Sequence, residues 1–400
     1  MPLFGLELCG QQRRAVVSMP SVREDPIFIL GAERSGTTLA MAMLGCHSQI
    51  SVPEVTWFYP RYRRYLQTYG PLSDARNFHT LLEEMLFGLK RPFFGLSVNP
   101  HTVLREIMQF VDDHSFRGAF KAIMEWHRTR CGKVRWGEKT PHSLFYLTDI
   151  FEDFPNAKVI LMYRDGRDVV CSQLRSCFGP TNAVAGALLW KRCARATIEA
   201  MHKYPAERLI AISYESMVTA AKDTLDQICH FLSEEYEPAM LAFYKGDLAT
   251  QRARAIDHRS LGEPVHSRFI GVHKDEMARC DERTFCQIAG DELRELGYEV
   301  GVAGQRLDPD YVDRMVERDA RTRAANLDAV GGHVVIESYA DWVVDQRELR
   351  RQGGIWSGPA PPVPSMDDWP QEQIEGFRAP RAFKRRFAIP RRYAASEWVL

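Results

Sequence analysis

The stretch Gly31-Ala-Glu-Arg-Ser-Gly-Thr-Thr38 decides the fold of this chain. It follows residues 26–30, a short apolar run that predicts a buried strand, and it leads into residues rich in helix formers. Two glycines five positions apart, Gly31 and Gly36, allow such a turn to point backbone N–H groups at one anion. The turn also carries a guanidinium and three hydroxyls, on Arg34, Ser35, Thr37 and Thr38. The sequence therefore predicts an anion-binding turn between a strand and a helix.

A second unit of the same kind lies at residues 158–175. Lys158-Val-Ile-Leu-Met-Tyr163 predicts a strand, Arg164-Asp-Gly-Arg-Asp168 a turn, and the residues from Val169 on a helix. Arg164 and Ser172 are eight positions apart, just over two helical turns, so both can face the edge where this strand ends. Together they suit a second phosphate, although an Arg–Asp pair in a surface turn is the alternative interpretation.

The order of the elements predicts the fold class. A third strand is expected at residues 209–213, and a helix follows at residues 222–232, where apolar side chains recur with helical spacing. Strands that alternate with helices predict an α/β fold, with a central, mainly parallel sheet flanked by helices. Ligands of such folds bind at the strand-to-helix turns.

The loop at residues 31–38 differs from the phosphate loop of nucleoside triphosphatases, and this difference bears on which nucleotide it binds. The phosphate loop of a nucleoside triphosphatase reads Gly-x-x-x-x-Gly-Lys-[Ser/Thr], and here Thr37 stands at the lysine position. A P-loop kinase or nucleotide hydrolase is therefore disfavoured and kept as an alternative. A catalytically inactive nucleotide-binding module of the same fold is the other alternative.

Taken together, the motifs resemble the sulfotransferases that use 3′-phosphoadenosine-5′-phosphosulfate (PAPS). Residues 28–39 resemble the loop that binds the 5′-phosphosulfate, and residues 158–172 resemble the strand, turn and helix that bind the 3′-phosphate. Trp136-Gly-Glu-Lys-Thr-Pro141 lies between them and is similar to the lysine segment of the family. Tyr214-Glu215 resembles the segment near the adenine, and Leu296-Gly-Tyr298 the end of the domain. Arg34 in the first loop is typical of the bacterial and tyrosylprotein branch.

The resemblance implies the P-loop-like nucleotide-binding fold of sulfotransferases and a set of site residues. The residues expected to bind PAPS are Arg34, Ser35, Gly36, Thr37, Thr38, Arg164, Ser172, Tyr214 and Ser267. Ser267 belongs, with Arg268, to a late loop expected to close over the nucleotide. No metal is expected to be required.

The reaction also needs catalytic groups. Arg34 and Lys139 are candidates to meet the charge that builds on the leaving nucleotide. Glu54 is the first candidate for the base that takes the proton of the acceptor, because Pro53-Glu-Val-Thr-Trp-Phe58 resembles the family segment that carries it. His142, three residues after Lys139, is the rival base. The acceptor is expected to be a hydroxyl of a small molecule, a lipid or a glycan.

Composition limits the partners and the compartment. Lys plus Arg number 52 and Asp plus Glu number 52, so a uniformly basic nucleic-acid-binding protein is excluded while a local anion site is not. No apolar stretch is long enough to span a membrane, and we expect no nucleic-acid partner. The N-terminus lacks the order of a secretory signal, and nine scattered cysteines are typical of reduced thiols, so a cytoplasmic protein is expected. A homodimer is left open.

The expected organisation has three parts. Residues 1–24 form an N-terminal segment, residues 25–300 the sulfotransferase domain, and residues 301–400 a C-terminal extension with a charged helix at 308–329 and a basic, Pro-rich end. Within the domain, residues 57–130 form a helical insertion expected on the acceptor side. The aromatic residues at 57–69 favour core packing, with lining of an acceptor pocket as the alternative.

Overall fold

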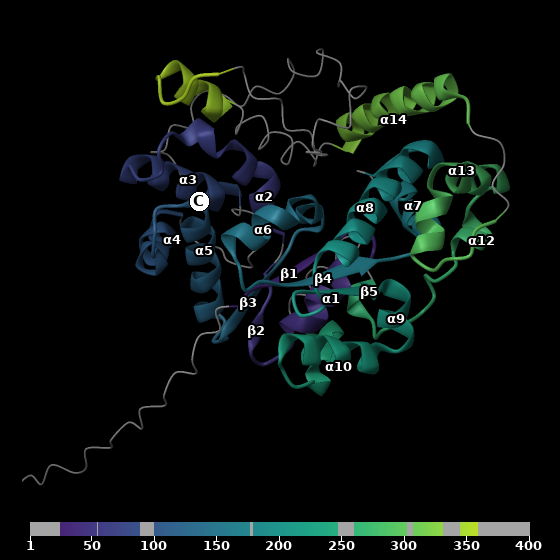
Figure 1. Ribbon diagram of the computed structural model, residues 1–400, viewed down its shortest axis with the longest axis horizontal. Helices are drawn as coiled ribbons and strands as arrows, with labels where there is room; N and C mark the ends of the chain where they lie inside the picture. The colour runs from purple at the N-terminus through teal and green to yellow at the C-terminus, as the bar shows by residue number, and fades with distance from the viewer. Residues whose placement is uncertain are drawn as a thin grey trace, which may run out of the picture.

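A five-stranded, fully parallel sheet forms the centre of the computed structural model, as Figure 1 shows. The structure describes residues 25–53, 55–88, 100–176, 179–246, 260–301, 307–330 and 345–358. In spatial order the strands are β2 (Ile50–Ser51), β3 (Arg135–Lys139), β1 (Ile27–Gly31), β4 (Lys158–Tyr163) and β5 (Leu209–Ser213). The prediction of an α/β fold with a mainly parallel sheet is confirmed.

Side chains alternate along each strand and build two cores, one on each face of the sheet. From β1, Ile27 and Ile29 join one core, while Phe28 and Leu30 join the other. The first core packs under α1 (Thr37–Gly45), α9 (Tyr214–Thr219), α10 (Ala221–Leu232) and η5 (Pro238–Lys245). The second packs under α2 (Phe58–Arg61), α3 (Ala75–Gly88), α4 (Pro100–Ile107), α5 (Phe116–Arg130), α6 (Leu147–Asp153), α7 (Gly166–Leu174), α8 (Ala183–Lys203) and α13 (Arg279–Glu295).

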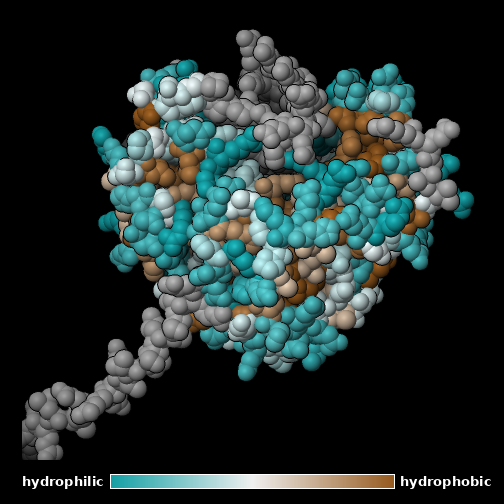
Figure 2. Space-filling view, viewed as in Figure 1, coloured by the Kyte–Doolittle hydropathy of each residue, from teal (hydrophilic) through white to brown (hydrophobic). Residues whose placement is uncertain are grey.

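Further elements are the 3₁₀ helices η1 (Arg63–Tyr69), η3 (Met108–Phe110) and η4 (Pro141–Tyr146), the short helix α12 (His273–Glu276) and the 22-residue helix α14 (Pro309–Val330). No helix among the described residues is long and apolar enough to cross a membrane. Figure 2 shows mostly hydrophilic residues on the face in view, with smaller hydrophobic patches between them.

Strand β3 is fully buried although its sequence is polar and charged. Arg135 has no exposed surface and pairs with Asp25 at 2.9 Å and with Glu234 at 3.3 Å. Its guanidinium also donates hydrogen bonds to the carbonyl oxygens of Asp25 and Leu232. These partners compensate the buried charge, which would otherwise be costly inside the sheet.

The aromatic run at residues 57–69 packs inside the molecule. Phe58, Tyr59, Tyr62, Tyr65 and Tyr69 are each at most 2% exposed. These five side chains are therefore packed in the core, as the favoured interpretation predicts. Trp57 is the half-buried member of the run.

Two parts of the C-terminal extension pack against the body of the protein. α14, at the expected charged helix, lies on α8, where Asp319 accepts hydrogen bonds from the backbone and hydroxyl of Thr181. A helix at residues 345–352 packs on the insertion, with Arg347 stacked 3.5 Å from the ring centre of Tyr65. The basic end at residues 378–392 and the segment 1–24 lie outside the described residues.

Candidate functional site: a cleft at the carboxyl ends of β1 and β4

The loop after β1 and the turn after β4 leave the sheet side by side. β1 and β4 pair in parallel with Gly31 opposite Met162, so both connections start at the same edge. Gly31 lies so close to β4 that an added Cβ would stand 2.1 Å from the carbonyl oxygen of Met162. The strand order places this edge where β3 and β4 flank β1 on opposite sides, which is the usual ligand position in open α/β sheets.

The first turn of α1 is built to face an anion. Gly36 precedes the helix with φ of 91°, and no side chain caps the free N–H groups. The first turn contains no acidic residue, so the positive end of the helix dipole is not neutralised there. Arg34 adopts φ of 68°, a conformation that costs energy for a side chain other than glycine and that turns this loop sharply.

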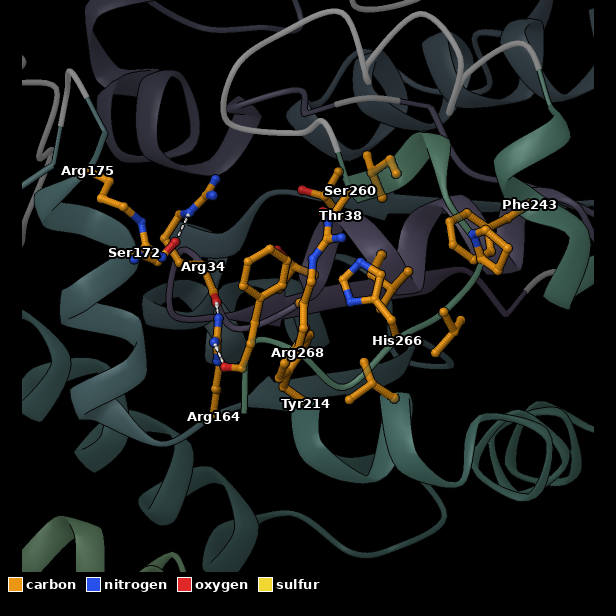
Figure 3. A pocket seen from close by; sticks show the side chains of 18 residues that line it. Arg34, Thr38, Arg164, Ser172, Arg175, Tyr214, Phe243, Ser260, His266 and Arg268 are labelled. Carbon is orange, nitrogen blue, oxygen red and sulfur yellow. Dashed lines mark hydrogen bonds between the residues drawn. The ribbon is translucent and has the colours of Figure 1, made fainter. Parts of the chain in front are cut away.

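These elements border a cleft of about 420 Å³. Its lining is charged at one end and apolar at the other: Arg34, Arg164, Ser172 and Arg175 lie at one end, and Phe243 at the other (Figure 3). Among the described residues, the lining contains four arginines and no carboxylate. The lining residues are Arg34, Gly36, Thr37, Thr38, Leu39, Arg164, Ser172, Arg175, Tyr214, Val218, Phe243, Ser260, Leu261, Pro264, Val265, His266, Arg268 and Phe269. Such a cleft suits a ligand with anionic groups and an apolar part.

The two predicted anion motifs meet in this cleft. Arg34 Nε donates a hydrogen bond to Ser172 Oγ at 2.9 Å, and Arg164 Nη1 donates one to the carbonyl oxygen of Arg34 at 3.1 Å (Figure 3). Arg34 belongs to the first motif, whereas Arg164 and Ser172 belong to the second. The structure therefore joins residues 138 positions apart into one site.

Arg164 is held from several sides. Its guanidinium carbon lies 4.3 Å from the ring centre of Tyr214, and Nη2 donates a hydrogen bond to the carbonyl oxygen of Phe269. Asp168 lies 3.9 Å away, and Trp190 Nε1 donates to the carbonyl oxygen of Arg164. Trp190 is buried, as expected for a core residue beside the site.

A third wall comes from residues 260–273. Asp168 fastens this wall, because it accepts hydrogen bonds from the backbone N of Gly271 at 2.7 Å, and from the backbone N and Nδ1 of His273 at 3.0 and 2.7 Å. Burial alone would raise the pKa of Asp168, but these hydrogen bonds and the nearby Arg164 hold it below its usual value. Ser267 is exposed and lies outside the lining, while its neighbours His266, Arg268 and Phe269 contribute to it.

Glu215 supports the turn after β4 from behind. It accepts hydrogen bonds from the backbone N of Asp165 at 3.1 Å and from the hydroxyl of Tyr298 at 2.9 Å. Burial raises the pKa of this carboxyl. The two residues of the Tyr-Glu segment thus have different roles. Tyr214 faces the cleft, and Glu215 links the turn after β4 to Tyr298 near the end of the domain.

The side chain of Lys139 reaches the start of α1, just after the loop that follows β1. It ends β3, is 4% exposed, and donates from Nζ to Thr38 Oγ1 at 3.4 Å. Lys139 does not itself line the cleft, but Thr38 does. Ser35 is fully buried under the loop, and its hydroxyl has no hydrogen-bond partner among the described residues.

Glu54 and His142 are the two candidate bases. Glu54 lies outside the described residues. His142, in η4, lines a second, very small cavity with Glu33 and Gln173, apart from the main cleft. Its Nδ1 lies 3.6 Å from Glu33 Oε1, and its ring stacks on Trp57 with centres 5.0 Å apart. The first loop therefore presents Arg34 and Gly36 to the cleft and Glu33 to His142.

Comparison with known proteins agrees with this geometry. The model of the sulfotransferase family matches residues 26–238, more than half of the chain. This chain belongs to the sulfotransferase family. The match begins just before β1 and extends past α10, so it contains both anion motifs and Lys139.

The individual relatives of this chain are distant. An uncharacterized protein of Aquifex aeolicus (strain VF5) is 26% identical over 56% of this chain, and the match takes in 27% of that protein. The protein-tyrosine sulfotransferase of Drosophila melanogaster is 26% identical over 55% of this chain, and the match takes in 40% of its length. The sulfotransferase domain from the Synechococcus PCC 7002 olefin synthase superposes with a TM-score of 0.50 at 20% identity, covering 70% of this chain and 97% of that domain.

The cleft also contains residues that the sequence analysis does not identify. Arg175, Phe243 and His266 line the cleft but were not singled out, and the Asp168–His273 contact was not foreseen. Asp168 belongs to the turn motif after β4, and its position one helical turn after Arg164 is the signal that the sequence carries for it. His273 carried no such signal, because only the folded chain brings it to α7.

Proposed function

We propose that this chain transfers a sulfuryl group from PAPS to a hydroxyl of a small-molecule, lipid or glycan acceptor. The observation that carries the proposal is that both anion motifs open into one cleft, joined by the hydrogen bond from Arg34 to Ser172. PAPS carries two separate anionic groups and an apolar purine base. The cleft offers an arginine-rich end and an apolar end, and its volume of about 420 Å³ suits a nucleotide.

Different residues of the cleft would bind different parts of PAPS. The N-terminus of α1, with Thr37 and Thr38, would hold the 5′-phosphosulfate. Arg164 and Ser172 would hold the 3′-phosphate, with Arg34 between the two groups. The apolar end around Leu39, Val218 and Phe243 would receive the adenine, with Tyr214 beside it; these three apolar residues and Tyr214 all line the cleft.

PAPS supplies a sulfuryl group on a good leaving group, so the protein has to position the reactants and stabilise charge. The bond between sulfur and the phosphate oxygen breaks, a bond between sulfur and the acceptor oxygen forms, and the acceptor proton passes to a base. Lys139, held at Thr38, stabilises the negative charge that builds on the phosphate oxygen. Glu54 and His142 are the candidate bases, and Glu33 Oε1 lies 3.6 Å from His142 Nδ1.

The direct test is transfer of label from ³⁵S-PAPS to pools of phenols, sterols, glycolipids and oligosaccharides. The proposal expects a labelled product from at least one pool and equal formation of 3′-phosphoadenosine-5′-phosphate (PAP). Binding of PAP without transfer to any pool would instead favour a binding module that kept the fold.

A further inference from the structure

The carboxyl of Glu138, next to Lys139 on β3, has no place in the mechanism above, yet it is completely buried. Phe28 is its register partner on β1, so Glu138 points to the face of the sheet opposite to that of Lys139. One strand end thus sends Lys139 toward the nucleotide loop and Glu138 toward the segment that follows β2. A buried carboxyl is costly unless its environment uses it.

Glu138 is the centre of a small hydrogen-bond network. Its Oε1 accepts hydrogen bonds from the hydroxyls of Thr56, at 2.8 Å, and Thr140. Thr140 Oγ1 in turn accepts hydrogen bonds from the backbone N of Thr56 and of Trp57, each at 3.2 Å. The network therefore ties the backbone at residues 56 and 57 to the end of β3.

This tie holds Trp57 in an unfavourable conformation. Trp57 has φ of 58°, a strained conformation for a residue other than glycine that persists only where neighbouring contacts impose it. In that conformation its indole stacks on His142 at an interplanar angle of 28°, while Arg61 covers it at 5.3 Å from the ring centre. The indole thus forms a fixed wall against His142.

Both candidate bases flank this network in the sequence. Glu54 stands two positions before Thr56, and His142 two positions after Thr140. We infer that Glu138 is a positioning residue, which fixes the acceptor-activating side of the site relative to Lys139 without touching either reactant. The inference rests on the proposed function for its rate measurement and on the stacking of Trp57 on His142 for its geometry.

The state of the carboxyl agrees with this role. Burial raises the pKa of Glu138, and the hydroxyls of Thr140 and Thr56 oppose that rise. Its second oxygen, Oε2, has no hydrogen-bond partner among the described residues. Glutamine keeps the accepting oxygen at nearly the same shape, whereas methionine fills the space and accepts no such hydrogen bond. The pair Glu138→Gln and Glu138→Met therefore separates the hydrogen bonds from the packing.

The rate experiment compares these variants in the full-length protein, with ³⁵S-PAPS and the acceptor pool that the wild type labels best. For Glu138→Met we expect transfer to fall by about 10–100-fold while the Kd for PAP stays within about threefold, as misplacement of a reacting group predicts. Glu138→Gln should restore most of the rate. Glu292→Gln, at a buried carboxyl of α13 that pairs with Arg195, is the matched control and should transfer normally.

A second measurement does not depend on activity. The ring protons of His142 should show an upfield NMR shift from the stacked indole, which Glu138→Met removes and Glu138→Gln and Glu292→Gln retain. Thr140→Val should act like Glu138→Met and Thr140→Ser like the wild type, which keeps the test valid if methionine prevents folding.

The outcomes are distinguishable. A folded Glu138→Met protein with normal transfer and an unchanged His142 signal would overturn the inference. So would a loss of PAP affinity as large as the loss of rate, because that would make Glu138 a general support of the fold. If the wild type transfers no label, the proposed function fails, while the His142 signal still decides whether Glu138 positions Trp57.

Discussion

Arg34 and Ser172 are 138 positions apart, yet Arg34 Nε donates a hydrogen bond to Ser172 Oγ at 2.9 Å. This contact joins the loop after β1 to the helix after β4, the two segments that carry the anion-binding motifs. Because the two strands are parallel neighbours, their following loops have to meet at one edge of the sheet. The contact turns two separate motifs into one nucleotide-sized cleft.

Replacing Arg164 with alanine should weaken binding of PAP by about 10–100-fold, because it removes charge-assisted hydrogen bonds to a phosphate. Calorimetry with PAP and with adenosine 5′-monophosphate (AMP), which lacks the 3′-phosphate, measures the effect. The loss should be much larger for PAP than for AMP. Arg195→Ala, at an exposed arginine of α8, is the control. Equal losses for both nucleotides would contradict the assignment of Arg164 to the 3′-phosphate.

Replacing Lys139 with alanine should lower the rate of transfer by about 10²–10³-fold, the usual effect of losing one group that stabilises charge in the transition state. The Kd for PAP should change little, since Lys139 does not line the cleft. Lys133→Ala is the matched control, because Lys133 lies before the other end of β3 and donates to the carbonyl oxygen of His47. A variant that binds PAP poorly but turns over normally would mean that the roles of Lys139 and Arg164 are exchanged.

Replacing Gly36 with alanine should both destabilise the protein and abolish tight PAP binding. Gly36 has φ of 91°, and an added Cβ would stand 2.9 Å from the ring of Tyr214, which packs on Arg164. Gly132→Ala is the control, because Gly132 also has a positive φ, of 66°, but nothing lies within 4 Å of the added Cβ. Backbone strain should lower the free energy of unfolding of each variant by roughly 1 kcal/mol, so both should unfold at a lower temperature than the wild type. If Gly36→Ala binds PAP as tightly as Gly132→Ala, the loop does not contact the ligand.

The Asp168–His273 contact should make stability depend on pH in a defined direction. The pKa of Asp168 is lowered in the folded state, so its ionised form stabilises the fold at pH values above the unfolded pKa of about 4. That contribution is lost as the pH falls through the folded pKa. Thermal unfolding of the wild type and of Asp168→Asn should therefore differ most above about pH 5 and converge toward about pH 2. A difference that stays constant across this range would show that the charge of Asp168 is not involved.

The strands that the sequence predicts are the apolar ones. β1, β4 and β5 are runs of Ile, Val, Leu and Met bounded by turns, and they appear within one residue of their expected bounds. β3 was missed because Arg135 and Glu138 interrupt any apolar pattern. Their burial depends on partners at Asp25, Glu234, Thr56 and Thr140, which only the folded chain brings together.

The site was predictable where a motif is local and not where it is assembled from distant segments. Arg34, Thr37, Thr38, Arg164, Ser172 and Tyr214 line one cleft, because each lies in a strand-to-helix connection or in the first two turns of the helix that follows it. Of the late loop expected at Ser267 and Arg268, Arg268 lines the cleft and Ser267 does not, while the bonds by which Asp168 fastens Gly271 and His273 have no local signal in the sequence. Glu54 lies outside the described residues, and its role as a base stays a prediction.

Calorimetric titration of the full-length protein with PAP, AMP and ATP tests the central claim, that the two anion motifs form one site for a nucleotide with a 3′-phosphate. The account predicts one PAP per chain in the presence of a chelator, with an affinity at least about tenfold higher than that for AMP. Failure to bind PAP, or tighter Mg²⁺-dependent binding of ATP, would contradict it.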